Sequence, residues 1–140
     1  MDRKIIVYVA APYIADTPED IQANIDYAVN LTAQINDAGH GLIFAFCMHK
    51  LTDGLIQKMK THKAPNDEYW YEASETMIKL CDAAVFGGDF HKSVGCMREV
   101  HCAGIPPEYD NFYLAKMYEL DNSIQKLADL IIKKWKLKNV

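Results

Sequence analysis

The chain has 140 residues, of which half are hydrophobic and 24% are charged, and its formal net charge is -4 at pH 7. This size and composition predict a single globular domain over residues 1–140. The negative balance argues against a nucleic-acid polymer as partner. The first residues lack a signal-peptide layout and no apolar run reaches membrane-spanning length, so we expect a cytoplasmic protein with no membrane partner.

Four cysteines are spread along the chain, at Cys47, Cys81, Cys96 and Cys102. None of them forms a C-x-x-C pair or a zinc-finger spacing, so we predict reduced, mostly buried thiols and no structural metal. The P-loop, G-x-G-x-x-G and G-x-S-x-G motifs do not occur in the sequence. Their absence argues against a P-loop NTPase, a dinucleotide dehydrogenase and an α/β-hydrolase, and no cofactor is expected.

The first elements of the chain are a strand and a long helix. Residues 5–11 form a nearly continuous apolar run, as in buried parallel strands, and Pro12 ends it. Thr17 is a good N-cap for a helix that stops at Gly39. The apolar positions of this helix recur at helical spacing and are Ile21, Ile25, Ala28, Leu31 (or Thr32) and Ile35.

Strands and helices continue to alternate downstream. A strand is predicted over 42–46, a helix over 51–60 and a loop over 62–67. The next helix has Trp70, Ala73, Met77 and Leu80 on its apolar face and leads to a strand over 83–86, which is followed by a helix over 95–103 ended by residues 104–107. A further strand is predicted within 111–117, and the last helix is capped by Asp121 or Asn122 and has Ile124, Leu127, Ile131 and Trp135 on one face.

This alternation predicts a three-layer α/β/α fold, flavodoxin- or Rossmann-like, with a doubly wound parallel sheet of about four to five strands. Ligands of such folds bind at the carboxyl ends of the strands. Here those ends are residues 8–13, 46–49 and 87–93.

The segment from residue 81 to residue 99 combines a strand, a polar loop and a helix start. Ser93 and Gly95 stand at that start, where free N–H groups and the helix dipole favour an anion. His91, Lys92 and Arg98 are close by and favour an anion slightly. The alternative to a site is an ordinary N-cap serine after a solvated loop, and the N-cap role is also compatible with an anion bound at the same N–H groups.

Glu99 lies in the same helix, at the edge of an apolar stripe formed by Cys96, Met97, Val100 and Ala103. A carboxylate so close to the sheet is costly unless it is paired or used in chemistry. The alternative is a partly exposed glutamate bonded to a neighbouring loop.

Other candidates lie at the ends of the first two strands and in the third predicted helix. Tyr8 is either a core residue or one that reaches the site, and the small residues before Pro12, including Ala11, let a ligand approach the backbone. For His49 and Trp70 a structural role is favoured over a functional one.

Together these pieces resemble the nucleoside 2-deoxyribosyltransferase-like superfamily, over roughly residues 5–103. Residues 6–13, IVYVAAPY, are similar to the family's Y-[LV]-A-G-P-[FY] opening, with Ala11 in place of the usual glycine. Ser93, Gly95 and Glu99 match its S-x-G-x-x-x-E motif. The similarity is greatest to small phage- or bacteria-encoded members of unknown function.

The resemblance implies that Glu99 is a nucleophile at C1′ of a nucleoside, forming a glycosyl ester, and that Tyr8 orients it. Ser93, where members acting on free nucleosides carry aspartate, implies a 5′-monophosphate substrate. The family's acid that assists base departure corresponds to a position near Ser74, with Glu75 and Asp67 close in sequence.

The resemblance also implies a homodimer, or a higher homo-oligomer, that completes each site with a partner residue such as Asn122 or Ser123. The expected activity is hydrolysis of the N-glycosidic bond of a (deoxy)nucleoside 5′-monophosphate. The alternatives are base exchange by a 2′-deoxyribosyltransferase and a nucleotide-binding or nucleotide-sensing module without turnover.

Overall fold

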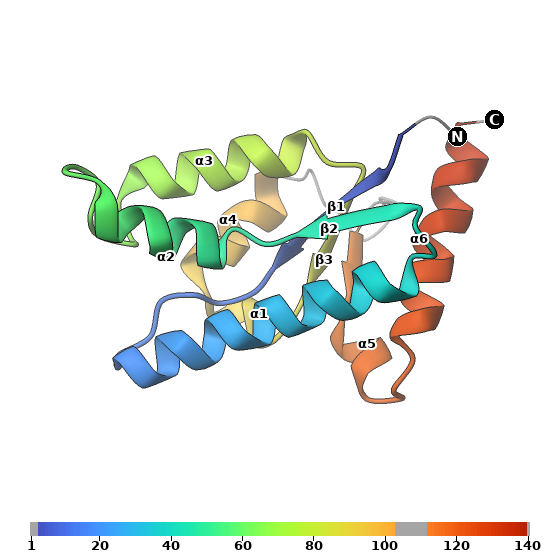
Figure 1. The fold of residues 1–140 in the computed structure, drawn as a ribbon, viewed down its shortest axis with the longest axis horizontal. Coiled ribbons are helices and arrows are strands. Elements are labelled where there is room, and N and C mark those ends of the chain that lie inside the picture. The colour runs from blue at the N-terminus through green and yellow to red at the C-terminus, as the bar shows by residue number, and fades with distance from the viewer. Residues whose placement is uncertain (1–2, 103–111, 140) are drawn as a thin grey trace.

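The computed structural model describes residues 3–102 and 112–139. Its centre is a four-stranded, all-parallel sheet in the order β2-β1-β3-β4 (Figure 1), which confirms the predicted α/β fold. The strands are β1 (Ile5–Ala10), β2 (Ile43–Phe46), β3 (Ala83–Phe86) and β4 (Phe112–Leu114).

Helices cover both faces of the sheet. They are α1 (Pro18–Ala38), α2 (His49–Lys58), α3 (Glu68–Lys79), α4 (Val94–Cys102), α5 (Lys116–Glu119) and α6 (Ile124–Lys138), with a short 3₁₀ turn η1 (Phe90–Lys92) before α4. α1 and α6 pack on one face and α3 and α4 on the other (Figure 1). Right-handed crossovers between parallel strands account for this placement. The connection from β1 to β2 runs over one face of the sheet, and the connection from β2 back past β1 to β3 runs over the other face.

The alternation of side chains along β1 decides what each face receives. Val7 and Val9 join the core formed with α1 and α6. Tyr8 and Ala10 point to the opposite face and pack with residues of α3 and α4. The register of β1 therefore places the Tyr8 hydroxyl on the side of the sheet that carries α4.

The start and the buried face of α1 agree with the prediction, whereas α2 starts earlier than predicted. The Thr17 hydroxyl accepts a hydrogen bond from the Asp20 N–H at 3.1 Å, which confirms Thr17 as the N-cap of α1. The buried face of α1 includes Ile25, Leu31 and Ile35, as the spacing predicts. The helix predicted over 51–60 begins two residues earlier, at His49.

Two predictions near element ends were wrong. Asp121 and Asn122 do not cap α6; Ser123 occupies the N-cap position, because Asn122 turns left-handed with φ 50°. Leu80 ends α3 as its C-cap and is 72% exposed, while Ile78 takes the buried position. The strand predicted within 111–117 is confirmed as β4, which spans Phe112–Leu114, and α5 begins soon after it at Lys116.

Three further expectations concern a helix end, the cysteines and membrane-spanning segments. The predicted helix end at residues 103–107 lies outside the described residues. All four cysteines are free thiols, of which Cys96 is buried and the other three are half-buried. Within residues 3–102 and 112–139, no helix has the length and apolar character needed to cross a bilayer.

Candidate active site

The candidate site lies where the strand order reverses. β2 and β3 flank β1 on opposite sides, so the carboxyl ends of β1 and β3 border the crevice in which doubly wound folds bind ligands. The Gly87 N–H donates to the Ala10 carbonyl at 2.8 Å and holds the two strand ends together. Two adjoining cavities open at this edge, here called the inner and the outer cavity.

Glu99 and Tyr8 meet at the bottom of the inner cavity. Glu99 is only 9% exposed and shares the buried face of α4 with Cys96, so the alternative of a partly exposed glutamate bonded to a neighbouring loop was wrong. Tyr8 is 2% exposed, and its hydroxyl donates a hydrogen bond to the Glu99 carboxyl. On its other side it lies within hydrogen-bonding reach of the Ser74 hydroxyl.

One oxygen of Glu99 is left without a partner. Its Oε2 atom is buried and has no hydrogen bond within the described part of the chain. A buried carboxylate oxygen in this state carries a large desolvation cost, and such groups are commonly functional. Both Tyr8 and Glu99 line the inner cavity, so a ligand there meets the glutamate directly.

Burial sets the protonation of this pair. Loss of solvent raises the pKa of Glu99 to about 7, with a smaller upward push from the negative charge of Glu75, and the bond from Tyr8 acts against both. Burial and the charge of Glu99 hold the pKa of Tyr8 well above its usual range. Near neutral pH, Tyr8 is therefore always a donor, while Glu99 exists in both forms.

The wall of the inner cavity away from Glu99 is mostly apolar and aromatic. It carries Tyr13, Ile14, Met48, Pro65, Trp70 and Tyr71. Two polar residues interrupt it, His49 and Thr52, and both are buried. An apolar wall with a few polar groups is typical of a site for a small organic ligand.

His49 has one satisfied and one unsatisfied ring nitrogen. Its Nε2 atom lies 2.7 Å from the Ala11 carbonyl and 3.2 Å from the Pro12 carbonyl, so it must carry the hydrogen. Burial lowers the pKa of His49 and keeps the ring neutral, which leaves Nδ1 as a buried acceptor without a partner in the described chain. His49 is thus both structural, as predicted, and part of the cavity wall.

Ser93 stands at the junction of the two cavities. Its Oγ atom accepts a hydrogen bond from the Cys96 N–H at 3.2 Å, which makes Ser93 the N-cap of α4 as expected. Gly95, which also lines both cavities, packs against Tyr71: a Cβ atom added to this glycine would lie 3.2 Å from the ring. The helix start therefore faces open space at both cavities.

The outer cavity lies beyond Ser93, on the side of the loop after β3. Pro12, Gly88, Asp89 and Lys92 line it. The Gly88 N–H donates to the Tyr27 hydroxyl at 3.0 Å, which fixes this loop in its left-handed turn at φ 61°. Lys92 contributes a positive charge to the wall and lies 3.9 Å from the Asp89 carboxylate.

The predicted site residues are thus placed unequally. Tyr8, Ala11, Ser93, Gly95 and Glu99 all line the inner cavity, and Pro12 lines the outer one. His91 is exposed in η1 and lines neither cavity, so the structure does not bring it to the site.

Two residues near the expected acid position are also engaged elsewhere. Asp67 caps α3 by accepting from the Tyr69 N–H at 2.9 Å and contacts His62. Glu75 is bound by Arg98. Ser74 lines the inner cavity, whereas Asp67 and Glu75 do not.

Thr52 and Tyr27 were missed by sequence reasoning. Thr52 follows His49 by three residues on α2, so the helical spacing could have placed both on one face. Tyr27 gives no such signal, because its partner Gly88 is 61 residues away in the chain.

Comparison of the chain with protein-family models, with curated proteins and with solved structures gives no significant match. Among the described residues, no group of three or more His, Cys, Asp or Glu side chains is arranged to hold a metal ion. The chemistry open to the site is therefore argued from its own side chains: a buried carboxylate, a tyrosine donor, a neutral histidine acceptor and a helix N-terminus.

Proposed function

We propose that this protein hydrolyses the N-glycosidic bond of a (deoxy)nucleoside 5′-monophosphate, with Glu99 as nucleophile. The observation that carries the proposal is the free, buried Oε2 atom of Glu99, held beside Tyr8 in a cavity that ends at the Ser93 cap of α4. A sugar bound between Glu99 and Ser93 would present C1′ to the carboxylate and its 5′ end to the start of α4.

The phosphate group belongs in the outer cavity. The Ser93 Oγ atom already accepts from Cys96, so its own hydrogen is free to donate to a phosphate oxygen. The first N–H groups of α4 and the positive charge of Lys92 add to the attraction. An aspartate at position 93 would repel the phosphate, whereas the serine accommodates it.

The base belongs in the inner cavity, between the aromatic walls given by Tyr13 and Trp70. The Nδ1 atom of His49 is there to accept an N–H of the base, which would satisfy an otherwise orphaned acceptor. This fixes the orientation of the base relative to Glu99.

The reaction takes two displacements. Glu99 Oε2 forms a bond to C1′ as the C1′–N bond breaks, and the bonding electrons leave with the base nitrogen. Water then attacks C1′, the ester oxygen of Glu99 leaves as carboxylate, and the products are the free base and a sugar 5-phosphate. The proton lost by the water balances the one gained by the base nitrogen. Tyr8 stabilises the carboxylate before the first step and after the second.

Nucleotide turnover tests the proposal directly. The protein is incubated with a panel of ribo- and deoxyribonucleoside 5′-monophosphates, and free base is followed by chromatography, with the matching nucleosides as controls lacking the phosphate. We expect the wild-type protein to release free base from nucleotides and the Glu99→Ala variant to release none. Cleavage by Glu99→Ala at the wild-type rate would exclude Glu99 as the nucleophile.

One observation favours a second candidate, a nucleotide-binding module without turnover. Ser74 occupies the region expected for the acid, and its hydroxyl lies within hydrogen-bonding reach of Tyr8. A serine hydroxyl in this position does not replace an acid that protonates the leaving base. This candidate predicts thermal stabilisation by a nucleotide with no product formed.

Adding a free acceptor base to the turnover assay separates hydrolysis from base exchange, since a new nucleotide appears only in base exchange.

A further inference from the structure

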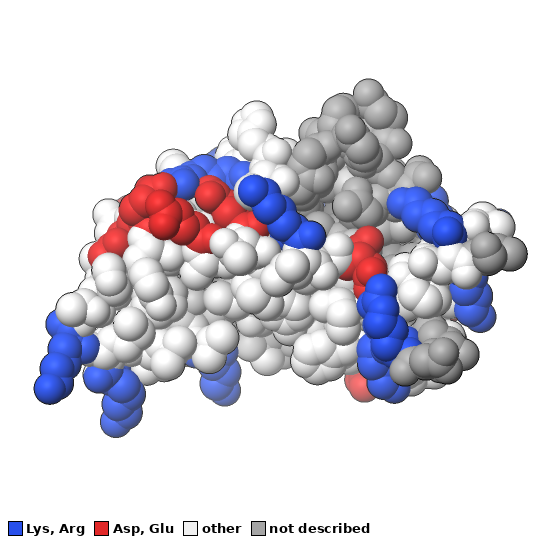
Figure 2. Space-filling view, turned by 90° about the horizontal axis from the view of Figure 1, so that it is seen from above, with Lys and Arg blue, Asp and Glu red and all other residues white. Residues whose placement is uncertain are grey.

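Acidic side chains gather on the face of the molecule that carries α3 (Figure 2). This helix contributes Glu68, Glu72 and Glu75, which are three or four residues apart and so lie along one side of it. Glu75 has a special position within this patch, because it directly follows Ser74 in the chain and its negative charge acts on the buried Glu99.

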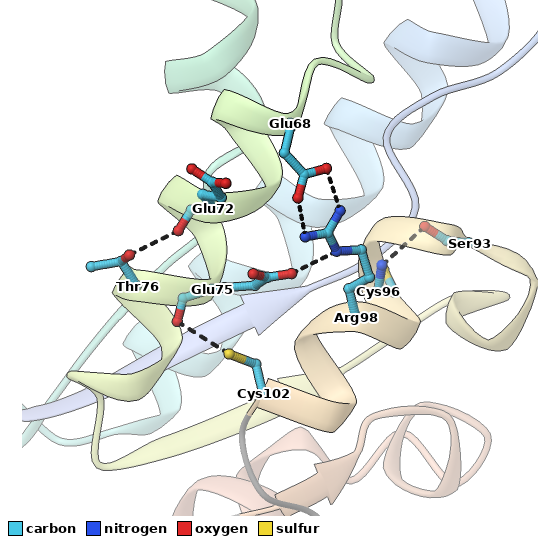
Figure 3. A network of polar contacts seen from close by, with 8 residues as sticks. All are labelled: Glu68, Glu72, Glu75, Thr76, Ser93, Cys96, Arg98 and Cys102. Carbon is cyan, nitrogen blue, oxygen red and sulfur yellow. Dashed lines mark hydrogen bonds and ion pairs between the residues drawn. The ribbon is translucent and has the colours of Figure 1, made fainter.

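A single arginine binds this patch from α4. The Nε atom of Arg98 donates to Glu75 Oε1 at 2.6 Å, and its two terminal nitrogens donate to the two oxygens of Glu68 at 2.7 and 2.5 Å (Figure 3). The guanidinium also lies over the Tyr71 ring, 4.7 Å from its centroid. Such a fork-shaped contact is strong and specific to arginine.

Arg98 and Glu99 are neighbours that point to different sides of α4. Arg98 faces α3 and the carboxylates there, whereas Glu99 faces β1 and the inner cavity. The helix therefore couples the two: the residue that neutralises Glu75 is fixed next to the residue on which the charge of Glu75 acts.

The other groups around Glu99 are uncharged near neutral pH. From β1, Tyr8 faces it as a hydroxyl donor; from α4, Cys96 carries a thiol whose pKa burial raises to about 12. From α2, His49 lines the same cavity as a neutral ring. Among the described residues, Glu75 is thus the charge that perturbs Glu99, and Arg98 is its counterion.

We propose that Arg98 is a positioning residue that sets the pH at which Glu99 becomes ionised, by holding and neutralising Glu75 on the neighbouring helix. The claim that this ionisation controls catalysis rests on the proposed glycosidase function; the control of the ionisation itself does not. The two members of the pair should therefore act on Glu99 in opposite directions.

The test compares Arg98→Gln with Glu75→Gln. Removing Arg98 leaves Glu75 as an uncompensated negative charge and moves the ionisation of Glu99 to higher pH. Removing Glu75 deletes that charge and moves it to lower pH. We expect shifts of about half a pH unit or more, equal to a roughly threefold change in the ionised fraction on the acidic side. Loosened packing alone would move both variants in the same direction.

Ionisation is measured by NMR titration of the carboxyl carbon of Glu99 in ¹³C-glutamate-labelled protein, assigned by the signal lost in Glu99→Gln. This readout needs no turnover. Opposite shifts without nucleotide cleavage would keep the inference and defeat the glycosidase; shifts in the same direction, or none, would overturn the inference whatever the activity.

Two further variants sharpen the test. Arg98→Lys keeps the charge without the fork, so the titration should return most of the way to wild type. Arg3→Gln removes an arginine with an equally bidentate partner, Asp82, away from the site, and should shift nothing. If Arg98→Gln does not fold, Glu75→Gln decides alone, and an upward or absent shift there overturns the proposal.

Discussion

The Tyr8 hydroxyl on β1 donates a hydrogen bond to the carboxyl group of Glu99 on α4, and both side chains are almost fully buried. The contact joins the central strand of the sheet to the helix whose first turn faces the two cavities. It stabilises the ionised form of a carboxylate that burial would otherwise keep protonated. The balance between these opposing effects sets the pH at which Glu99 becomes a carboxylate, the form that the proposed mechanism requires.

The rate of nucleotide hydrolysis should therefore fall as the pH drops through about 7, the pKa of Glu99. Only the carboxylate is a nucleophile, so kcat/KM should decrease about tenfold per pH unit below that value. Tyr8→Phe removes the hydrogen bond that favours the carboxylate. It should therefore move this decrease, the acidic limb of the pH–rate profile, to higher pH.

Tyr13→Phe provides the matched control for the pH limb, because the Tyr13 hydroxyl bonds Asp53 at 3.0 Å rather than Glu99. The position of the limb should stay where it is in that variant, whatever happens to the rate itself. A limb that moves equally in Tyr8→Phe and Tyr13→Phe would contradict the role given to Tyr8.

Glu99→Gln should stabilise the fold at neutral and alkaline pH. Burial raises the pKa of Glu99 from 4.5 to about 7, so between these values the native state holds a proton that the unfolded state has lost. The free energy of unfolding therefore decreases as pH rises through this window, by about 3 kcal/mol in all, and the loss is complete above pH 7. Glutamine does not ionise and escapes this loss.

Urea unfolding of wild type and Glu99→Gln at pH 4.5 and pH 8 measures this effect. The two proteins should differ little at the lower pH, and the variant should be the more stable at the higher pH. An equal pH dependence for both would show that burial does not raise the pKa of Glu99 in the folded protein, and would weaken its assignment as nucleophile.

The sequence predicted the parts of the site that local signals encode. The cap at Ser93 and the placement of Tyr8 on a buried strand follow from spacing within one element, whereas spacing alone left the role of Glu99 open. The sheet edge at which they meet follows from the alternation of strands and helices. These features depend on neighbours in the chain, so propensity and periodicity are sufficient to find them.

Features that depend on packing between distant segments were not predictable in this way. The depth of Glu99 depends on how α3 packs on α4, and a helical wheel of α4 alone places it at an edge. The Arg98–Glu75 bond joins residues 23 apart. At α6 a preference for Asp or Asn caps was overridden, since the left-handed turn at Asn122 delays the helix start.

Ser93→Asp should shift the substrate preference from nucleotides towards nucleosides. The new carboxylate would face the phosphate in the outer cavity and repel it, whereas a free 5′-hydroxyl could donate to it. We expect kcat/KM for a 5′-monophosphate to fall by about 100-fold, with a much smaller loss, or a gain, for the matching nucleoside.

Ser93→Asn is the control for Ser93→Asp, because asparagine can also cap α4 but carries no charge. Its effect on nucleotide hydrolysis should be smaller by about tenfold. If the aspartate and asparagine variants lose the same activity on nucleotides and gain none on nucleosides, the residue caps the helix without discriminating the 5′ group.

His49→Phe should weaken nucleotide binding by removing the acceptor for the base. The Nδ1 atom of His49 is buried without a partner in the described chain, so a base N–H that meets it gains a hydrogen bond worth about a tenfold change in Kd. Calorimetry in a Glu99→Gln background, where the nucleotide is not consumed, measures this loss. Deoxyribose 5-phosphate has no base and should bind both proteins equally.

A nucleotide whose ring N–H is methylated separates the hydrogen bond from general damage to the cavity. Such a ligand has no ring hydrogen to donate, so His49→Phe should change its affinity little while it weakens the parent nucleotide. The substitution also removes the bond from Nε2 to the Ala11 carbonyl, which holds the end of β1. If that structural bond were the whole role of His49, the parent, the methylated nucleotide and deoxyribose 5-phosphate would all lose affinity together.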